Sequence, residues 1–245
     1  MLLALYRTEG IVLRTRNLGE ADKIVTLLTK DEGKIRAAAS GARRMRSRLL
    51  ALCQPFVHGK FLLFRGKNLD RLSQGELLNP YRVLREDLST MALAAYFAEL
   101  VDVFLEERDP HEDLFLLLAN TFTWLADMGP STTLARYFEL HLLSYTGYRP
   151  QLDRCVGCGA PGEGFSVERG GMVCSACQPS GVPLLSPGTW EMLRQLARGR
   201  LRIVGILKPS ESISREMEGV LSSYISFHGQ RPIKSVDFLR SIGGG

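Results

Sequence analysis

The chain contains 245 residues, of which 45% are hydrophobic and 23% are charged, and its formal net charge is +5 at pH 7. This composition excludes an intrinsically disordered chain, and the length suffices for two domains with cores of their own. Residues 1–80 carry 15 Lys and Arg against 7 Asp and Glu, residues 81–150 carry 5 against 11, and residues 151–245 carry 11 against 8. A basic segment followed by an acidic one indicates modules with different partners.

The apolar segments are too short for secretion or for a membrane span. Arg7 and Glu9 directly follow the apolar residues 1–5, so no signal-peptide core of adequate length is expected. The longest apolar stretch, residues 114–126, is interrupted by Asn120 and two threonines and is shorter than a bilayer-spanning helix. We therefore expect a cytoplasmic protein that does not bind membranes.

The first 80 residues are expected to form a small β-barrel. Short β-branched segments alternate with turn signals, and residues 30–33 are typical of a hairpin turn that ends in glycine. Five strands are predicted, at residues 8–15, 23–29, 34–39, 56–64 and 69–76. Five short strands in one small domain favour a closed barrel over a sheet with crossover helices, and the OB-fold has this strand number and size. Residues 40–54 then connect the third strand to the fourth.

Residues 81–245 are expected to form a helical domain, which makes the overall class α+β. The pair Asn79 and Pro80 interrupts the strand pattern and marks the boundary, after which apolar residues recur with helical spacing. Helices are predicted at residues 84–107, 110–128, 132–146, 187–199 and 212–228. The residues predicted to cap helix N-termini are Asp109, Ser131 and Ser186. The helical pattern is interrupted at residues 153–180.

Four cysteines in this interruption have the spacing of a metal site. Two Cys-x-x-Cys pairs are separated by fifteen residues, and the glycines around them permit the tight turns that aim four sulfurs at one ion. The expected ligands are Cys155, Cys158, Cys174 and Cys177. An ion with four thiolate ligands has no open position for water or substrate, so we expect Zn²⁺ with a structural role. The alternative, four unliganded or paired thiols, requires the spacing to be chance.

No pattern in the sequence is typical of an active site. Residues 157–162 match the Gly-x-Gly-x-x-Gly motif of dinucleotide-binding loops, but they lie between metal ligands and follow no predicted strand. The four histidines are scattered without the spacing of a catalytic triad, and Cys53 lies in an apolar stretch typical of a core thiol. The acidic residues between positions 99 and 113 are expected to form a solvated helix face. We expect no enzymatic activity.

The basic residues of the predicted barrel form a candidate nucleic-acid interface, since no Asp or Glu occurs between Gly33 and Leu69. The expected DNA-binding residues are Lys34, Arg36, Arg43, Arg44, Arg46, Arg48, Lys60, Arg65 and Lys67. Cations placed on phosphates give salt-dependent, sequence-independent affinity. Two other interpretations stay open: a solvated basic face, or an adaptor whose basic barrel binds an acidic protein. A second basic cluster comprises Arg194, Arg198, Arg200 and Arg202. It either extends the DNA-binding surface or complements the negative end of a helix dipole.

Several short motifs in the first 56 residues resemble a known family. In order, they are Gly10-Ile-Val-Leu13, Gly19-Glu20-Ala-Asp22-Lys23, Gly33, Ser40-Gly41-Ala42-Arg43-Arg44, Ser47-Arg48 and Gln54-Pro55-Phe56. Together they resemble the N-terminal region of the bacterial DNA repair protein RecO family, and the helical region with its cysteine cluster extends the resemblance over nearly the whole chain. The resemblance implies an N-terminal OB-fold and a helical domain with a zinc-binding insertion.

The same resemblance implies a function. It indicates a recombination mediator of the RecF pathway that binds single- and double-stranded DNA and anneals complementary strands. It implies action with RecR to help load RecA onto strands covered by single-strand-binding protein, and hence a nucleoid-associated location. A protein of this family is expected to make no covalent bonds in its substrates.

Overall fold

The computed structural model describes residues 4–243, with side chains from Ala4 to Leu239. Residues 1–3, part of the apolar N-terminus considered above, lie outside this range. The chain divides into two compact units: residues 1–129 with 233–245, here called unit 1, and residues 130–232, here called unit 2. Among the described residues, no helix combines the length and apolar character needed to cross a membrane.

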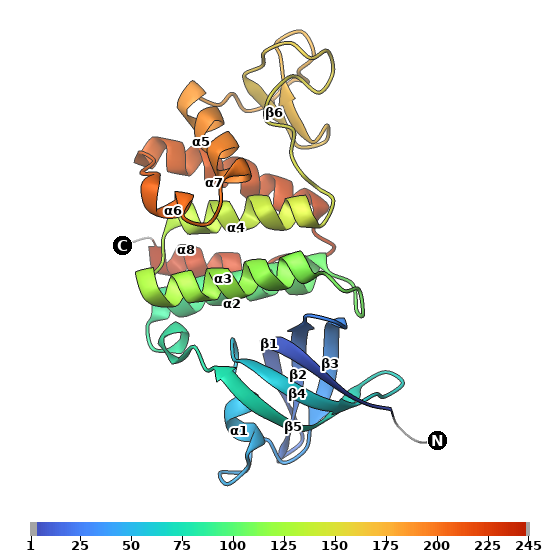
Figure 1. Ribbon diagram of the computed structural model, residues 1–245. Coiled ribbons are helices and arrows are strands. Elements are labelled where there is room, and N and C mark those ends of the chain that lie inside the picture. Colours follow the sequence, from blue (N-terminus) through green and yellow to red (C-terminus); the bar gives the residue numbers. More distant parts are fainter. Residues whose placement is uncertain (1–3, 244–245) are drawn as a thin grey trace. The chain divides into compact units, whose positions relative to one another are not determined.

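The secondary structure follows the predicted change from strands to helices (Figure 1). Unit 1 consists of β1 (Leu5–Leu18), β2 (Asp22–Thr29), β3 (Gly33–Ala39), α1 (Leu49–Leu52), β4 (His58–Phe64), β5 (Asp70–Asn79), the 3-10 helix η1 (Arg82–Arg85), α2 (Leu88–Phe104), α3 (Glu112–Met128) and α8 (Ser235–Gly243). Unit 2 consists of α4 (Thr132–Tyr145), β6 (Gly164–Ser166), β7 (Gly171–Val173), α5 (Pro187–Arg198), α6 (Ile203–Ile206) and α7 (Glu211–His228).

The five N-terminal strands close into a barrel in the order β1-β2-β3-β5-β4. β1 pairs antiparallel with both β2 and β4, and β3 pairs in parallel with β5 at Ala37 and Asp70. A bulge between Val12 and Arg14 shifts the register of β1 against β2. This strand order is that of the OB-fold, so the predicted five-stranded OB barrel is confirmed.

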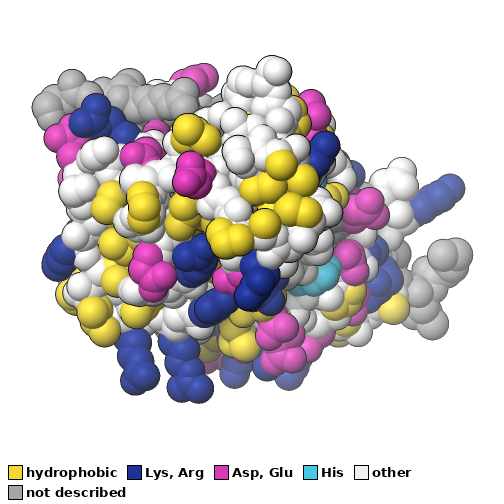
Figure 2. Space-filling model, turned by 90° about the horizontal axis from the view of Figure 1, so that it is seen from above, with side chains coloured by type: hydrophobic (Ala, Val, Ile, Leu, Met, Phe, Trp, Pro, Cys, Tyr) yellow, Lys and Arg dark blue, Asp and Glu magenta, His cyan; other side chains and the backbone are white. Residues whose placement is uncertain are grey.

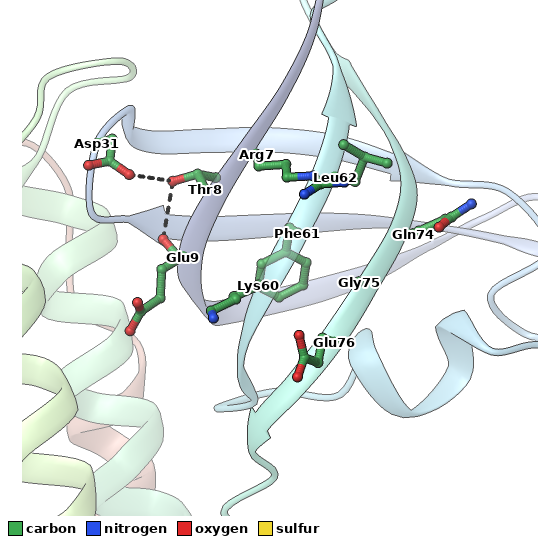
Figure 3. A pocket seen from close by; sticks show the side chains of 10 residues that line it. All are labelled: Arg7, Thr8, Glu9, Asp31, Lys60, Phe61, Leu62, Gln74, Gly75 and Glu76. Carbon is green, nitrogen blue, oxygen red and sulfur yellow. Dashed lines mark hydrogen bonds between the residues drawn. The ribbon is translucent and has the colours of Figure 1, made fainter.

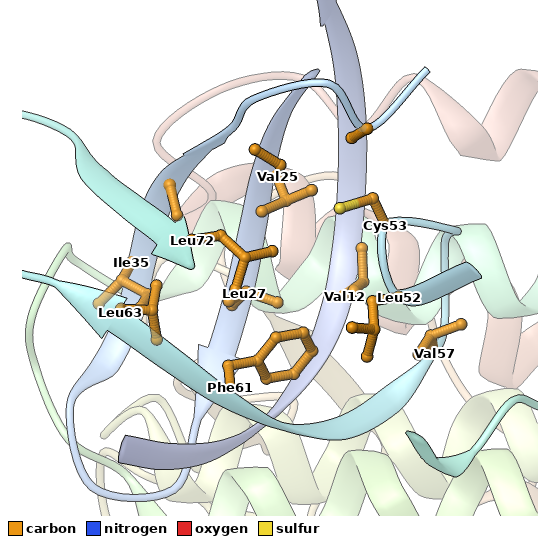
Figure 4. Close-up of a cluster of buried hydrophobic side chains, with 13 residues drawn as sticks. Val12, Val25, Leu27, Ile35, Leu52, Cys53, Val57, Phe61, Leu63 and Leu72 are labelled. Atoms are coloured by element: carbon orange, nitrogen blue, oxygen red, sulfur yellow. The ribbon is translucent and has the colours of Figure 1, made fainter. Parts of the chain in front are cut away.

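Alternating side chains of these strands fill the barrel (Figure 4). Val25 and Leu27 from β2 meet Phe61 and Leu63 from β4, and all four side chains are buried. The short helix α1 contributes the buried thiol of Cys53, whose pKa burial raises to about 11. Because Phe61 is fully enclosed in this core, it is not available to stack on a nucleic-acid base.

A buried carboxylate joins the barrel to the segment that follows α2. Asp70 accepts hydrogen bonds from the Tyr6 hydroxyl, from Arg108 Nη2 at 2.7 Å and from the Gly66 backbone at 2.8 Å. Burial alone raises the pKa of Asp70, but these hydrogen bonds outweigh it, so the pKa lies below its usual value. Burial of the Tyr6 ring likewise raises the pKa of that phenol.

The start of α3 differs from the prediction. The helix begins at Glu112, and Asp109 does not cap it. Residues 107 and 108 instead pair with β3, because the Arg108 backbone donates a hydrogen bond to Lys34 and residue 107 forms a parallel bridge with the same strand. Arg108 takes a left-handed φ of 61° in this contact, and the helix starts only after Pro110, at Glu112.

In unit 2, the predicted helix caps at Ser131 and Ser186 are confirmed. The Ser131 side chain accepts a hydrogen bond from the Leu134 backbone, and the Ser186 side chain accepts one from the Thr189 backbone. Helices α4, α5 and α7 pack on one another, and the hairpin of β6 and β7 lies in the chain between α4 and α5. The insertion into the helical pattern is therefore a small β-hairpin with the cysteine pairs around it.

Candidate nucleic-acid interface and metal centre

The loop between β3 and α1, residues 40–48, is here called the arginine loop. Gly41 takes a left-handed conformation with φ of 68°, and its backbone amide donates to Asp22 Oδ1 at 2.7 Å. The Arg43 backbone amide donates to the carbonyl of Ala21 at 2.9 Å, and successive turns follow along the loop. The backbone is thus fixed against the turn between β1 and β2, while the long side chains project from it.

The side chains of this loop are exposed and largely unpaired. Arg43, Arg44, Arg46 and Arg48 are all exposed, and Met45 between them is 94% exposed. The Arg43 guanidinium donates to a backbone carbonyl at 2.8 Å. None of the ion pairs formed by the described side chains involves an arginine of this loop. These guanidinium groups can therefore take phosphate ligands without breaking an existing ion pair.

Lys34 differs from the prediction, because it is not exposed for contact with DNA. Its ammonium group is buried, lies 3.3 Å from Asp102 Oδ1, and donates to the Asp102 carbonyl at 2.5 Å. Arg14 of β1 contacts the other oxygen of the same carboxylate at 2.9 Å. A cation enclosed in this way cannot reach a phosphate, because transfer to DNA would leave the Asp102 carboxylate buried with one partner fewer.

Two further predicted residues are exposed only in part and already carry a carboxylate partner. Arg36 lies 2.6 Å from Glu107, and Arg65 lies 2.6 Å from Glu32. With Lys67, Arg36 lines a cavity of about 320 Å³ to which the segment after α2 contributes Arg108. The charges of Arg36 and Arg65 are thus largely compensated, whereas Lys67 is exposed and takes part in none of the ion pairs formed by the described side chains.

Lys60 lies elsewhere, in a cavity of about 480 Å³ over β1, β4 and β5 (Figure 3). Its cationic lining is Lys60 and Arg7, whereas the acidic lining comprises Glu9, Asp31 and Glu76. An excess of carboxylates repels phosphate. Lys60 is therefore separated from the other predicted residues in a surrounding that disfavours DNA.

The exposed barrel cations outside the predicted interface include Arg16. Arg16 follows Arg14 on β1 with strand periodicity, and both residues pair with β2 on the face that also carries Arg36 of β3. Arg16 is exposed, whereas Arg14 is held by the buried carboxylate described above. Arg14 lies within the predicted strand and Arg16 just after its end, so the alternation of the two arginines was the available signal.

The four predicted metal ligands lie together in unit 2. The sulfurs of Cys155, Cys158, Cys174 and Cys177 are all within 4.8 Å of one another. The sulfurs of Cys158 and Cys174 are 3.5 Å apart, close to the roughly 3.8 Å expected between thiolates that bind one ion at about 2.3 Å in tetrahedral geometry. The cluster can hold a metal ion, and the geometry fits a site made only of sulfur.

Local backbone geometry aims these sulfurs. The Gly157 amide points at Cys155 Sγ at 3.4 Å, and a tight turn brings Gly159 back to the carbonyl of Cys155. A hydrogen bond from the Cys174 backbone lowers the pKa of Cys155 to about 6, while hydrogen bonding to Cys158 raises the pKa of Cys177 to about 12.

Comparison with known proteins decides the family. A model described as Recombination protein O N terminal matches residues 1–81, and one described as Recombination protein O C terminal matches residues 85–237. The chain belongs to the RecO family. The boundary between the two RecO models falls between β5 and α2, at η1. The compact unit around the barrel extends further, since it includes α2, α3 and α8.

Whole-length relatives agree. The chain is 42% identical over 249 residues to the DNA repair protein RecO of Symbiobacterium thermophilum, covering 98% of both chains. It is 38% identical to that of Pelotomaculum thermopropionicum, over 98% of this chain and 96% of the relative. It is 38% identical to that of Bacillus pumilus, over 97% and 94%. The likeness to these RecO proteins therefore includes the barrel, the helices and the cysteine insertion.

Proposed function

We propose that this RecO-family chain is a recombination mediator that binds single- and double-stranded DNA and anneals complementary strands. It acts with RecR to help load RecA onto strands covered by single-strand-binding protein, in the cytoplasm at the nucleoid, and has no enzymatic activity. The family membership over the whole chain carries this proposal. The exposed arginine loop supports it and gives DNA a place to bind.

The arginine loop supplies the chemistry that sequence-independent DNA binding needs. Its guanidinium groups project from a backbone fixed by hydrogen bonds, so little ordering is required when they meet phosphates. Each phosphate contact releases counterions and makes the affinity fall with salt. Phosphate contacts carry no base information, and cations that neutralise two strands at once reduce their mutual repulsion. Annealing of any complementary pair follows from these two properties.

The test compares two variants that each lose two positive charges. Arg44→Gln with Arg46→Gln changes the arginine loop, and Arg200→Gln with Arg202→Gln changes exposed arginines of unit 2 as the matched control. Binding of a fluorescein-labelled oligothymidylate is measured across a salt series. Each lost phosphate contact reduces the logarithmic salt slope by about 0.7 for single strands, so the loop variant is expected to lose about 1.4 and the control little.

Two results would oppose the proposal in different ways. Equal slopes for the wild-type chain and the loop variant would remove the arginine loop from the DNA interface. Absence of DNA binding by the purified wild-type chain, together with binding to an acidic protein through the barrel, would favour the adaptor function over the mediator.

For the cysteine cluster we propose Zn²⁺ with a structural role. Four thiolates are typical ligands of structural zinc and leave no coordination position for a substrate. Elemental analysis of the purified chain is expected to give one zinc per molecule. Cys174→Ser is expected to lower that content and to destabilise unit 2, while the arginine loop keeps its salt-dependent binding. Folded wild-type chain without zinc would refute the metal assignment.

A further inference from the structure

A cavity of about 360 Å³ in unit 2 is lined by the segment of residues 149–153 and by one face of α5. Its charged lining consists of Arg149, Arg194 and Arg198 against the single carboxylate of Asp153. The lining therefore carries an excess of two positive charges, which Glu191 just outside it, 3.8 Å from Arg194 Nη1, reduces to one. The barrel cavity that contains Lys60 has the opposite balance, with more acids than bases.

The guanidiniums of Arg194 and Arg198 are held in place by specific contacts. Arg194 and Arg198 are four residues apart on α5, so they project from the same face of the helix. Arg194 Nε donates to the backbone carbonyl of Leu152 at 2.9 Å. Asp153 Oδ1 lies 2.5 Å from Arg198 Nη2 and 3.6 Å from Arg194 Nε. One carboxylate oxygen thus already occupies a position between two guanidiniums where an oxygen of a bound anion would fit.

The opposite wall is fixed to the β6–β7 hairpin of the cysteine insertion. The Gln151 backbone donates to Gly170 at 2.9 Å, and Met172 of β7 donates back to Gln151 at 2.8 Å. A side chain at Gly171 would lie 2.4 Å from the Gln151 carbonyl, so this close approach requires glycine. The shape of the cavity therefore depends on the folded cysteine insertion, while both walls and all three arginines belong to unit 2.

On one face of the molecule, local clusters of this kind stand out from a mixed surface. On the face displayed in Figure 2, the Lys and Arg side chains are scattered among acidic and hydrophobic ones. A diffuse basic surface therefore does not cover that face. A cluster of three arginines that line one cavity is a different feature, because planar guanidinium groups match the oxygens of a phosphate with two parallel hydrogen bonds.

We propose that the cavity of Arg149, Arg194 and Arg198 binds backbone phosphate of a nucleic-acid strand, as a second contact point besides the arginine loop. Asp153 acts there as a built-in competitor that the phosphate displaces from Arg198. This inference rests on the proposed function and extends it by adding a second place where strand phosphates are neutralised. Arg200 and Arg202 are exposed but do not line the cavity, so they lie outside the site.

The experiment uses two variants with opposite expected effects. Arg149→Gln with Arg198→Gln removes two cations of the cavity, and Asp153→Asn removes the competing carboxylate and leaves every cation in place. In a salt titration with fluorescein-labelled oligothymidylate, the double variant is expected to lose about 1.4 from the logarithmic slope if both contacts are made. Asp153→Asn is expected to bind more tightly than the wild type.

Arg200→Gln with Arg202→Gln is the control, because it loses the same charge from the same unit outside the cavity. Annealing of two complementary oligonucleotides is measured in parallel and is expected to slow in the cavity variant and not in the control. Zinc content and thermal unfolding verify that each variant is folded. Opposite responses of the double variant and Asp153→Asn cannot both arise from misfolding.

The outcomes separate this inference from the proposed function. A normal slope for the cavity variant, with a reduced slope for the arginine-loop variant, overturns the second site and leaves the DNA-binding function intact. If the cavity variant and the control lose equally from the salt slope, the effect is one of net charge alone, and the second site is also overturned. If the cavity variant binds DNA normally but no longer binds an oligoglutamate peptide, the cavity is a binding site for an acidic protein instead, and the second DNA site is overturned. Wild-type chain that binds no DNA refutes the proposed function itself.

Discussion

Lys34 provides the sharpest test of how the barrel uses its cations, because position in the sequence and position in the structure predict opposite roles for it. If Lys34 binds DNA, then Lys34→Met weakens DNA binding and leaves stability unchanged. If it is the buried partner of Asp102, the same substitution lowers stability and leaves the DNA affinity of the folded chain unchanged. Methionine retains the length and apolar stem of lysine and removes the charge, so the substitution isolates the ammonium group.

The expected loss of stability follows from the contacts. Removing one partner of a buried ion pair costs about 3–5 kcal/mol, because the other charge stays buried without compensation. Here the Asp102 carboxylate keeps Arg14 at 2.9 Å, so we expect a value near the lower limit, about 3 kcal/mol. Arg46→Met in the exposed arginine loop is the matched substitution, and surface changes of this kind stay within about 0.5 kcal/mol.

The chain offers a selective probe of this unit. Its two tryptophans are Trp124 on α3 in unit 1 and Trp190 on α5 in unit 2. In a Trp190→Phe background, urea unfolding followed by tryptophan fluorescence reports on unit 1 alone. Lys34→Met is expected to lower the midpoint clearly and Arg46→Met is not, whereas only Arg46→Met reduces the salt slope of DNA binding. An unchanged urea midpoint together with a reduced salt slope for Lys34→Met would refute the reasoning.

Two further predictions concern unit 1. Gly33→Ala is expected to be much more destabilising than Gly19→Ala. Both glycines have positive φ, but only a Cβ at position 33 would lie 2.2 Å from the carbonyl oxygen of Asp109. Comparison of the urea midpoints of the two variants measures the difference. Asp70 has a lowered pKa in the folded chain, so its contribution is present above about pH 4 and is lost as pH falls further. Asp70→Asn should therefore flatten the acid limb of the stability profile, and a limb as steep as that of the wild type would contradict the assigned network.

Much of the barrel could be predicted because its determinants are local. Alternation of buried and exposed side chains places β2 and β3 within one residue of their observed bounds. β1 extends well beyond its predicted range, from Leu5 to Leu18, because it pairs with β4 over its first half and with β2 over its second. Polar residues are tolerated at both ends of such a strand, so composition alone gives no sign of its length.

Features that depend on distant residues could not be predicted. The backbone amides at Lys234 and Ser235, where α8 begins, donate to the carboxylate of Glu99 on α2, at 3.1 and 2.7 Å. This cap comes from a residue more than 130 positions earlier, and helix α8 packs on α2 in unit 1. The sequence around the C-terminal residues predicts only that they belong to the helical domain, because nothing near them identifies Glu99 as their partner.

The same limitation explains why some of the predicted interface cations are paired with carboxylates and others are not. An acid-free window in the sequence says only that no carboxylate is nearby along the chain. Lys34 and Arg36 lie on a paired strand whose outer face meets the end of α2, and there Asp102 and Glu107 neutralise them. The arginine loop lies outside the strand ladder, so its cations keep their charge. The metal ligands required no such information, because their spacing alone brings the sulfurs together.

The acidic block between residues 81 and 150 therefore has a different meaning from the one its charge suggests. It was expected to signal a module with a partner of its own, yet Asp102, Glu107 and Glu112 are counter-ions of barrel cations within unit 1. The barrel is consequently much less basic towards solvent than its composition implies. DNA affinity then has to come from the few cations without carboxylate partners, and this concentrates the expected effect of substitution on the arginine loop instead of spreading it over all nine predicted residues.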